Sequence, residues 1–384
     1  MARSWDIFCR VVDNYGDAAV CWRLARQLSL EHRGTVRLWI DELQALQSLC
    51  PDVGVALDCQ TVETVEIRRW VPGANFGAAA DIAVEAFGCG LPQSYVDAMV
   101  ARDRRPVWIV LEYLSAEPWV VSHHRLPSPH PRLPLDRWFF FPGFVPGTGG
   151  VLREATLEPR RLAFVKDPDA GKRFWHKLGF SAPKAGALAV SFFGYENPAV
   201  RDLLQAWAEG GREIVVAVPR GRLRGDVCEF FGADDPADGT VLSKGRLEAR
   251  FIPFLPQAVY DEFLWACDWN FVRGEDSVVR GQWAARPFTW QIYPQAERAH
   301  DAKLASFLDC YCAGMDPGLE APLRRFWSGW NGASKGTGTI GEDWEALAAR
   351  IAELQAHAEM WARKLALPGE LAANLAHYCE ERLK

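Results

Sequence analysis

The sequence lacks the features of a membrane or secreted protein. Its 384 residues contain no apolar run near the roughly 20 residues that a membrane-spanning helix needs. The opening residues, MARSWDIFCRVVDNYGD, reach acidic side chains too early for a signal peptide. The ten cysteines are scattered, and only Cys310 and Cys312 lie close together, without the second pair typical of a zinc site. We therefore expect a cytoplasmic protein with reduced thiols and no bound metal.

Long basic runs and several common enzyme motifs are also missing. The net charge of -6 gives no reason to expect a nucleic-acid partner. The sequence has no Walker loop, no G-x-S-x-G elbow and no H-E-x-x-H zinc motif. No G-x-G-x-x-G follows the first expected strand, and Gly88-Cys89-Gly90 lacks the third glycine. This absence disfavours an NAD- or FAD-linked oxidoreductase.

What the chain does contain is a repeated alternation of strand and helix patterns. Its length exceeds one ordinary hydrophobic core, so we expect two domains. Strands alternating with helices predict parallel sheets covered on both faces, as in an α/β fold with two Rossmann-like domains. In the first half, strands are expected at 4–12, 36–40, 81–87 and 106–114, with helices after 17 and at 94–102.

The second half restarts the same rhythm after a Pro- and Gly-rich stretch at 118–159, which we expect to be loop-rich. Strands are expected at 188–193, 213–218, 247–252, 269–272 and 288–292, and helices at 198–210, 257–266 and 277–285. An apolar stripe at 347–365 and a last segment at 370–383 are helical in pattern. The expected domains are 1–160, joined by the C-terminal helix 362–384, and 161–361.

The segment Arg273-Gly274-Glu275-Asp276-Ser277 lies directly between an expected strand and an expected helix. Gly274 allows the backbone to approach a ligand closely, and the helix N-terminus offers N–H groups to a phosphate. Arg273 adds a positive charge. These features favour a diphosphate site, although Asp276 and Ser277 are also residue types that simply cap a helix.

The equivalent position in the first half carries Asp13-Asn14-Tyr15-Gly16-Asp17. Two carboxylates four residues apart flank a turn that opens into a helix, and either a helix cap or acid–base chemistry explains them. Two further strand ends carry aromatic residues: Phe193 and Tyr195 after one strand, and Phe254 after another. These rings are suited to stacking on a base, and Gln257 to binding its polar edge, but buried core packing explains them equally well.

These motifs together resemble the bacterial protein-arginine rhamnosyltransferases that modify elongation factor P, the EarP family. The resemblance extends over nearly the whole chain and is carried by VVDNYGDAAVCWRLARQL at 11–28, LEYLSAEPWV at 111–120, SFFGYEN at 191–197, FIPFLPQ at 251–257 and RGEDSVVRGQWAARPFTWQIYPQ at 273–295. It implies a GT-B fold with two Rossmann-like domains facing across a cleft. It also implies TDP-rhamnose as donor, an arginine of elongation factor P as acceptor, inversion at the anomeric carbon and no metal or other cofactor.

The resemblance also implies roles for individual residues. Asp13 and Glu275 are the essential carboxylates, and Asp17 lies close to the same chemistry. The residues expected to contact the donor are Asn14, Tyr15, Gly16, Tyr195, Leu255, Gln257, Arg273, Gly274, Asp276 and Ser277. We expect Asp13 to accept a proton from the arginine, Asp17 to help orient the guanidinium, and Glu275 to hold a hydroxyl or a neighbouring donor group.

Two other functions remain open on the sequence. A GT-B enzyme with another nucleotide-sugar donor or a small-molecule acceptor has the same fold-level features. A non-catalytic nucleotide- or protein-binding module is a further alternative, which the paired carboxylates disfavour.

Overall fold

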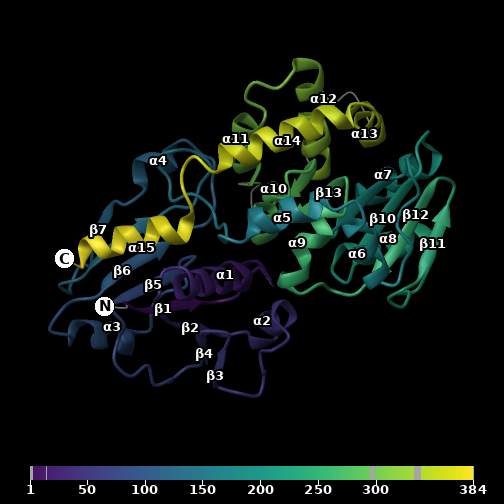
Figure 1. Cartoon of the computed structure of the whole chain (residues 1–384). Coiled ribbons are helices and arrows are strands. Elements are labelled where there is room, and N and C mark those ends of the chain that lie inside the picture. Colours follow the sequence, from purple (N-terminus) through teal and green to yellow (C-terminus); the bar gives the residue numbers. More distant parts are fainter. Residues whose placement is uncertain (1–2, 14, 295–297, 299, 333–338, 384) are drawn as a thin grey trace. The chain divides into compact units, whose positions relative to one another are not determined.

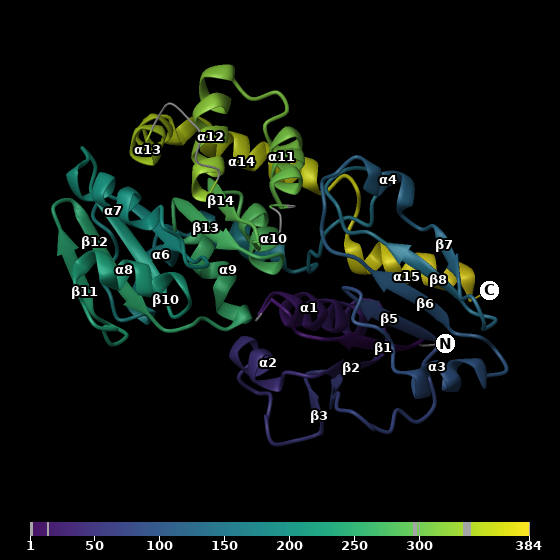
Figure 2. The same ribbon diagram turned by 180° about the vertical axis from the view of Figure 1, so that it is seen from behind.

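The computed structural model describes residues 3–13, 15–294, 298, 300–332 and 339–383 and divides into two compact units. Unit 1 comprises Met1–Ala155 and Leu365–Lys384, and unit 2 comprises Thr156–Lys364. The first division therefore falls before the expected position at 160, and the second falls after the expected position at 361. Both units are α/β layers in Figures 1 and 2, and each is described by itself. No helix among the described residues has the length and apolar character needed to cross a bilayer.

Unit 1 is built on one sheet of eight strands in the order β3-β4-β2-β1-β5-β6-β8-β7. The two edge strands β3 and β7 are antiparallel to their neighbours, and the six strands between them are parallel. The strands are β1 (Ser4–Cys9), β2 (Thr35–Ile40), β3 (Cys59–Val62), β4 (Val65–Arg69), β5 (Ile82–Ala86), β6 (Val107–Leu111), β7 (Pro127–Pro129) and β8 (Asp136–Phe140). The helices are α1 (Gly16–Leu30), α2 (Leu43–Leu49), α3 (Gln93–Val100), α4 (Trp119–His123) and α15 (Leu371–Arg382).

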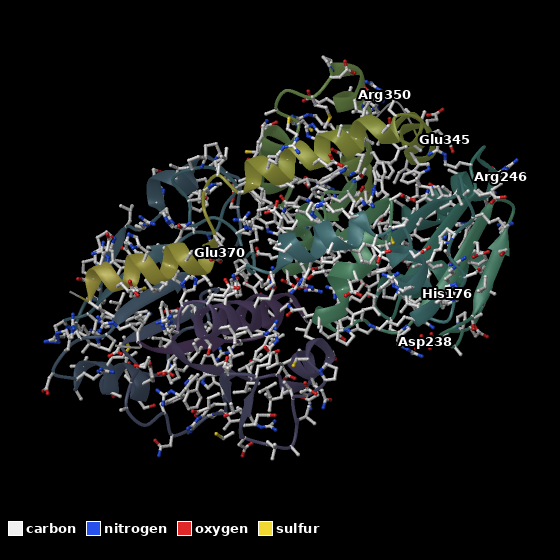
Figure 3. The ribbon with its side chains drawn as sticks, viewed as in Figure 1. His176, Asp238, Arg246, Glu345, Arg350 and Glu370 are labelled. Carbon is white, nitrogen blue, oxygen red and sulfur yellow. The ribbon has the colours of Figure 1, made fainter. Side chains whose placement is uncertain are left out.

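The last helix, α15, belongs to the first unit. Glu370 lies where α15 begins (Figure 3), and its carboxylate accepts hydrogen bonds from the N–H groups of Ala372 and Ala373. The Leu371 N–H donates to the carbonyl of Val151 at 3.1 Å, and α15 packs against α1. These contacts join the two segments of unit 1, the N-terminal segment and the C-terminal segment, to each other.

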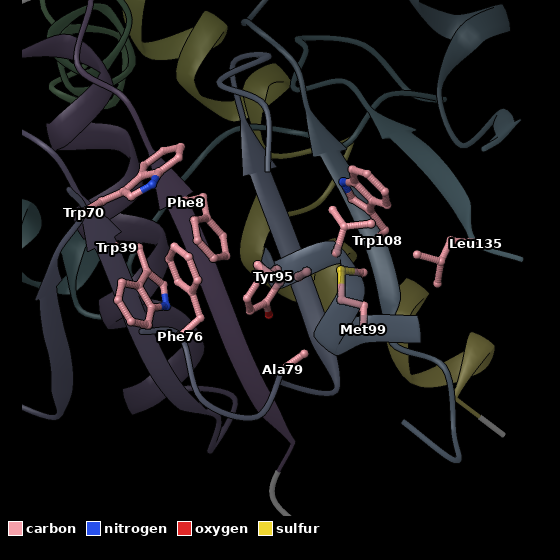
Figure 4. Packing of buried hydrophobic residues seen from close by; sticks show 11 residues of the cluster. Phe8, Trp39, Trp70, Phe76, Ala79, Tyr95, Met99, Trp108 and Leu135 are labelled. Atoms are coloured by element: carbon pink, nitrogen blue, oxygen red, sulfur yellow. The ribbon is translucent and has the colours of Figure 1, made fainter. Parts of the chain in front are cut away.

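The core of unit 1 is aromatic. Phe8 packs against Trp39, Phe76 and Tyr95 with ring centroids 5.9, 5.7 and 4.6 Å away (Figure 4). The fully buried carboxylate of Asp6 lies beside this cluster. It accepts two hydrogen bonds of 2.6 Å from Arg37, together with bonds from the Trp39 indole and the Tyr95 hydroxyl. A buried charge is tolerated because it is paired and hydrogen-bonded on several sides.

Unit 2 has a six-stranded sheet in the order β11-β12-β10-β9-β13-β14, parallel except for the edge strand β11. The strands are β9 (Leu188–Phe192), β10 (Ile214–Pro219), β11 (Val241–Lys244), β12 (Leu247–Ile252), β13 (Trp269–Arg273) and β14 (Phe288–Gln291). The helices are α5 (Leu157–Lys166), α6 (Ala170–Lys177), α7 (Val200–Glu209), α8 (Leu223–Phe231), α9 (Gln257–Trp265), α10 (Asp276–Trp283), α11 (His300–Tyr311), α12 (Pro317–Trp330), α13 (Ile340–Ala349) and α14 (Ile351–Leu365).

Tryptophan fills much of the core of unit 2. Trp269 of β13 contacts Trp344 of α13 at 4.8 Å, and Phe271 of the same strand contacts Trp330 of α12 at 4.8 Å. Trp207 of α7 packs on Trp344 at 5.1 Å. All five rings are at most 1% exposed, and their contacts join α7, α12 and α13 to one another and to β13.

The structure corrects the prediction in three places. The stretch 118–159 is less irregular than expected, because it contains α4, β7 and β8, and β8 pairs in parallel with β6. β7 itself consists of Pro127, Ser128 and Pro129, and prolines lie close to both ends of β8, whose apolar pattern is short. The first strand ends at Cys9 rather than at residue 12, which leaves Val12 in the turn. The apolar stripe at 347–365 is shared by two helices, α13 and α14, which meet at Arg350.

Candidate active site

Each of the two sheets has a topological switch point with predicted site residues beside it. In unit 1, β1 lies between β2 and β5, and the chain continues from β1 to the β2 side before it crosses to β5. In unit 2, β9 lies in the same way between β10 and β13. Connections on the two sides of such a point diverge, which opens a crevice at the carboxyl ends of the two strands. The loop with Asp13 follows β1, and the Arg273–Ser277 loop follows β13.

Hydrogen bonds within the turn after β1 fix the backbone at Asp13. The N–H groups of Val12 and Asp13 both donate to Oδ2 of Asp17, at 2.8 and 2.9 Å. The N–H of Gly16 donates to the Asp13 carbonyl at 2.6 Å. A Cβ atom at Gly16 would lie only 2.7 Å from Oδ2 of Asp13, so glycine is required for the observed position of that carboxylate.

Asp17 is a buried carboxylate with a structural task. Its residue is 3% exposed, and burial raises the pKa of its carboxyl group, while the hydrogen bonds from Asp13 and Val12 oppose that rise. The bonded N–H groups precede α1, so Asp17 holds the turn rather than capping the helix in which it lies. Tyr15 is the N-cap residue of α1. Asn14, also predicted to contact the donor, lies outside the described residues.

The loop after β13 is folded tightly against its own strand. Gly274 has a φ of 58°, a backbone conformation that favours glycine. The hydroxyl of Ser277 accepts from the Arg273 N–H at 2.9 Å and donates to the Arg273 carbonyl. Helix α10 begins at Asp276, and its N-cap Glu275 makes no side-chain cap hydrogen bond. The first N–H groups of a helix have no acceptor within the helix, which is why helix N-termini can bind phosphate.

The guanidinium of Arg273 lies close to two aromatic rings. Its Cζ is 4.8 Å from the centroid of Phe193 and 4.5 Å from that of Tyr195, and the residue is 4% exposed. Cation–π contacts of this kind fix the direction of a guanidinium. Phe254 contacts Phe193 at 6.2 Å, so the three aromatic residues predicted for a base are gathered with Arg273. Tyr195 is only 2% exposed, which leaves Phe193 and Phe254 as the half-buried rings of the group.

Asp276 and Gln257 are joined in a buried polar network. Oδ2 of Asp276 accepts from Nε2 of Gln257 at 3.0 Å and from Nε of Arg280 at 3.1 Å. Arg280 also donates to Asp261 at 2.8 Å. All four residues are less than 10% exposed, so the network fixes α9 against α10. Leu255, which lies between β12 and α9, is buried with 7% exposure.

Three residues that brace the site were not singled out in the sequence. The Trp290 indole donates to the carbonyl of Gly274 at 2.9 Å, and Oε1 of Gln291 accepts from the Tyr195 N–H at 2.8 Å. Both residues lie in the segment 273–295. Their place at the end of an expected strand could have indicated a role near the site. Nζ of Lys303 in α11 lies 3.6 Å from Oε1 of Glu275. No local pattern pointed to Lys303, because the pairing depends on how α11 packs.

One group of described residues, Glu31, His32 and Glu370, could bring three metal-ligand atoms within 4.8 Å of one another. Both carboxylates are already engaged by the protein: Glu31 accepts from the Ala155 N–H at 3.0 Å, and Glu370 caps α15. The group therefore has a structural explanation. Glu31 is the C-cap residue of α1, at the opposite end of that helix from the turn with Asp13.

Comparison with known proteins identifies the family. The family model described as elongation factor P (EF-P) rhamnosyltransferase EarP matches residues 5–380. A protein-arginine rhamnosyltransferase of Pseudomonas aeruginosa is 44% identical over 375 residues, which cover 98% of each chain. One of Pseudomonas putida is 43% identical over the full length of both chains, and one of Neisseria meningitidis is 32% identical over 97% of each.

Solved structures agree with the sequence comparison. A structure from work on EarP-mediated arginine glycosylation of translation elongation factor EF-P matches 99% of both chains with a TM-score of 0.72 and 32% identity. The calicheamicin glycosyltransferase CalG4 matches with a TM-score of 0.50 at 14% identity, a likeness of fold alone. Two parallel-rich sheets and these neighbours establish the GT-B fold. The chain belongs to the EarP family of EF-P rhamnosyltransferases and is an enzyme of the protein-arginine rhamnosyltransferase class.

Proposed function

We propose that this enzyme transfers rhamnose from TDP-β-L-rhamnose to one arginine side chain of elongation factor P, with inversion at the anomeric carbon and without a metal or other cofactor. The observation that carries the proposal is the turn after β1, where Asp17 binds the N–H groups of Val12 and Asp13 and Gly16 leaves room for the Asp13 carboxylate. The ten free thiols fit a reaction in the cytoplasm. The names of the relatives support arginine and rhamnose.

Asp13 acts as the general base in this proposal. An arginine guanidinium is protonated and delocalised, and is therefore a poor nucleophile until it loses a proton. As a guanidinium nitrogen forms its bond to the anomeric carbon, one N–H proton passes to the carboxylate of Asp13. Asp17 fixes the backbone that carries the Asp13 side chain, through the two N–H groups that it binds. This refines the earlier expectation that Asp17 itself orients the acceptor.

Unit 2 supplies the leaving-group site in this proposal. The bond between the anomeric carbon and the diphosphate oxygen breaks, and its electron pair leaves with TDP. Arg273, directed by Phe193 and Tyr195, and the N-terminus of α10 are suited to stabilise the negative charge that builds on the diphosphate. Such stabilisation needs no Mg²⁺. Attack on the carbon opposite the departing oxygen inverts its configuration from β to α.

The donor and the stereochemistry are tested with a panel of nucleotide sugars and a product spectrum. We expect turnover with TDP-rhamnose, little with UDP-glucose or GDP-sugars, and the same rate with and without a metal chelator. NMR of the glycosylated arginine is expected to show an α-anomeric proton. Preferred turnover of another donor would contradict the donor assignment, a β-linked product would contradict inversion, and loss of activity with chelator would contradict metal independence.

A further inference from the structure

Glu275, the second carboxylate expected to be essential, forms an ion pair with Lys303. Glu275 follows Gly274 at the carboxyl end of β13, and Lys303 lies in the first turn of α11. Nζ of Lys303 is 3.6 Å from Oε1 of Glu275, and the two side chains are 16% and 17% exposed. The pair is therefore shielded from water on most sides, unlike an exposed pair whose attraction solvent and salt reduce.

The charges around the β13–α10 loop show why this pair matters. Asp276 is matched by Arg280 at 3.1 Å, and Arg280 also meets Asp261 at 2.8 Å. Glu275 adds another carboxylate beside Arg273, in the loop proposed to receive a diphosphate. An anionic side chain there opposes an anionic ligand unless a cation lies close to it. Lys303 is such a cation, and it is contributed by a different helix.

We propose that Lys303 is a positioning residue for Glu275: its ammonium group fixes the direction of the Glu275 carboxylate and offsets that carboxylate's repulsion of the donor diphosphate. Glu275 can then accept a hydrogen bond from a hydroxyl of the donor sugar without weakening the binding of the nucleotide. A lysine suits this task because its compact ammonium group carries three N–H donors. The inference rests on the proposed function, since it assumes a nucleotide-diphosphate donor.

The test compares Lys303→Met, which keeps the length of the side chain, with Lys303→Arg, which keeps its charge. Lys172→Met is the matched control, because Lys172 is 65% exposed and pairs with Asp169 on α6. We expect Lys303→Met to weaken TDP binding in calorimetry and to raise the KM for TDP-rhamnose by about tenfold, a difference of about 1.4 kcal/mol. We also expect kcat to fall. Lys303→Arg should recover most of both values, and the control should match the wild type.

A double-mutant cycle shows whether Lys303 acts through Glu275. In a Glu275→Gln background, Lys303→Met is expected to change TDP affinity much less than it does in the wild type, because the repelling charge has gone. Equal effects in the two backgrounds, or wild-type kinetics in a folded Lys303→Met protein, would overturn the proposal. If the wild type fails to turn over TDP-rhamnose, the donor assignment has failed instead. The same cycle is then measured with the nucleoside diphosphate that the wild type binds.

Discussion

Substitutions of Asp17 and Asp13 by asparagine should separate a structural carboxylate from a chemical one. Oδ2 of Asp17 accepts hydrogen bonds from the N–H groups of Val12 and Asp13, at 2.8 and 2.9 Å. An amide oxygen has two lone pairs and can accept both bonds, so Asp17→Asn keeps the turn. Asp13→Asn instead removes the group proposed to accept the proton. Both variants are nearly isosteric with the wild type. Asp17→Asn loses only a charge, whereas Asp13→Asn loses the proposed proton acceptor.

The expected magnitudes follow from these contacts. Hydrogen bonds to a charged group contribute roughly 1.5–3 kcal/mol each, so Asp17→Ala loses at most about 3–6 kcal/mol. Burial raises the pKa of Asp17, which shows that its charged form is itself disfavoured and offsets part of that loss. We expect Asp17→Ala to lower the free energy of unfolding by about 2–3 kcal/mol and Asp17→Asn by less than about 1.5 kcal/mol.

Urea unfolding and initial rates with TDP-rhamnose and the protein acceptor measure both effects. General-base loss in Asp13→Asn is expected to lower kcat by about 10²–10⁴-fold with TDP affinity unchanged. Asp17→Asn should stay within about tenfold of the wild-type kcat, a change in barrier of about 1.4 kcal/mol. A folded Asp17→Asn protein as inactive as Asp13→Asn would refute this reasoning. It would show that the charge of Asp17 takes part in the chemistry.

Three further predictions concern the turn, the core and the C-terminal helix. Gly16→Ala should lower kcat without lowering the unfolding midpoint, because its Cβ would displace the Asp13 carboxylate while alanine favours the helix; unchanged kcat would contradict this. Asp6→Ala should lower the free energy of unfolding by roughly 3–5 kcal/mol in urea titrations, because Arg37 loses its buried partner, and a loss under about 1 kcal/mol would be inconsistent with the network. Nε2 of His32 lies 3.8 Å from Oε2 of Glu370, and this carboxylate raises the pKa of His32 above 6.5, so the stabilisation is complete below that value and is lost as pH rises through the higher folded pKa. The thermal midpoint should therefore fall less between about pH 6 and pH 9 in His32→Gln than in the wild type, and identical pH profiles would contradict this contribution.

The sequence predicted those features that depend on local pattern. Runs of apolar residues indicated buried strands such as β1 and β10. Polar residues after β1 and β13 indicated the loops that follow these two strands. β8 was missed because prolines surround its short pattern. Its place in the sheet comes from pairing with β6, which no local signal encodes.

The contacts between the predicted site residues could not be inferred from the sequence. Phe193 and Tyr195 were proposed to stack on a base, and the structure places both rings against Arg273. Whether Phe193 also meets the base stays a prediction. The pairing of Glu275 with Lys303 joins a strand end to a later helix. Such long-range contacts follow from packing between helices, so a single sequence gives no period or motif from which to infer them.

The measurement that tests the central claim most directly is the intact mass of the acceptor protein. Purified enzyme is mixed with TDP-rhamnose and unmodified elongation factor P from the same organism. We predict a gain of one deoxyhexose, lost when the acceptor arginine is replaced and strongly slowed with Asp13→Asn enzyme. No gain in mass, with a folded acceptor and donor binding confirmed by calorimetry, would contradict the proposed acceptor. A gain at full rate with Asp13→Asn would contradict the proposed base.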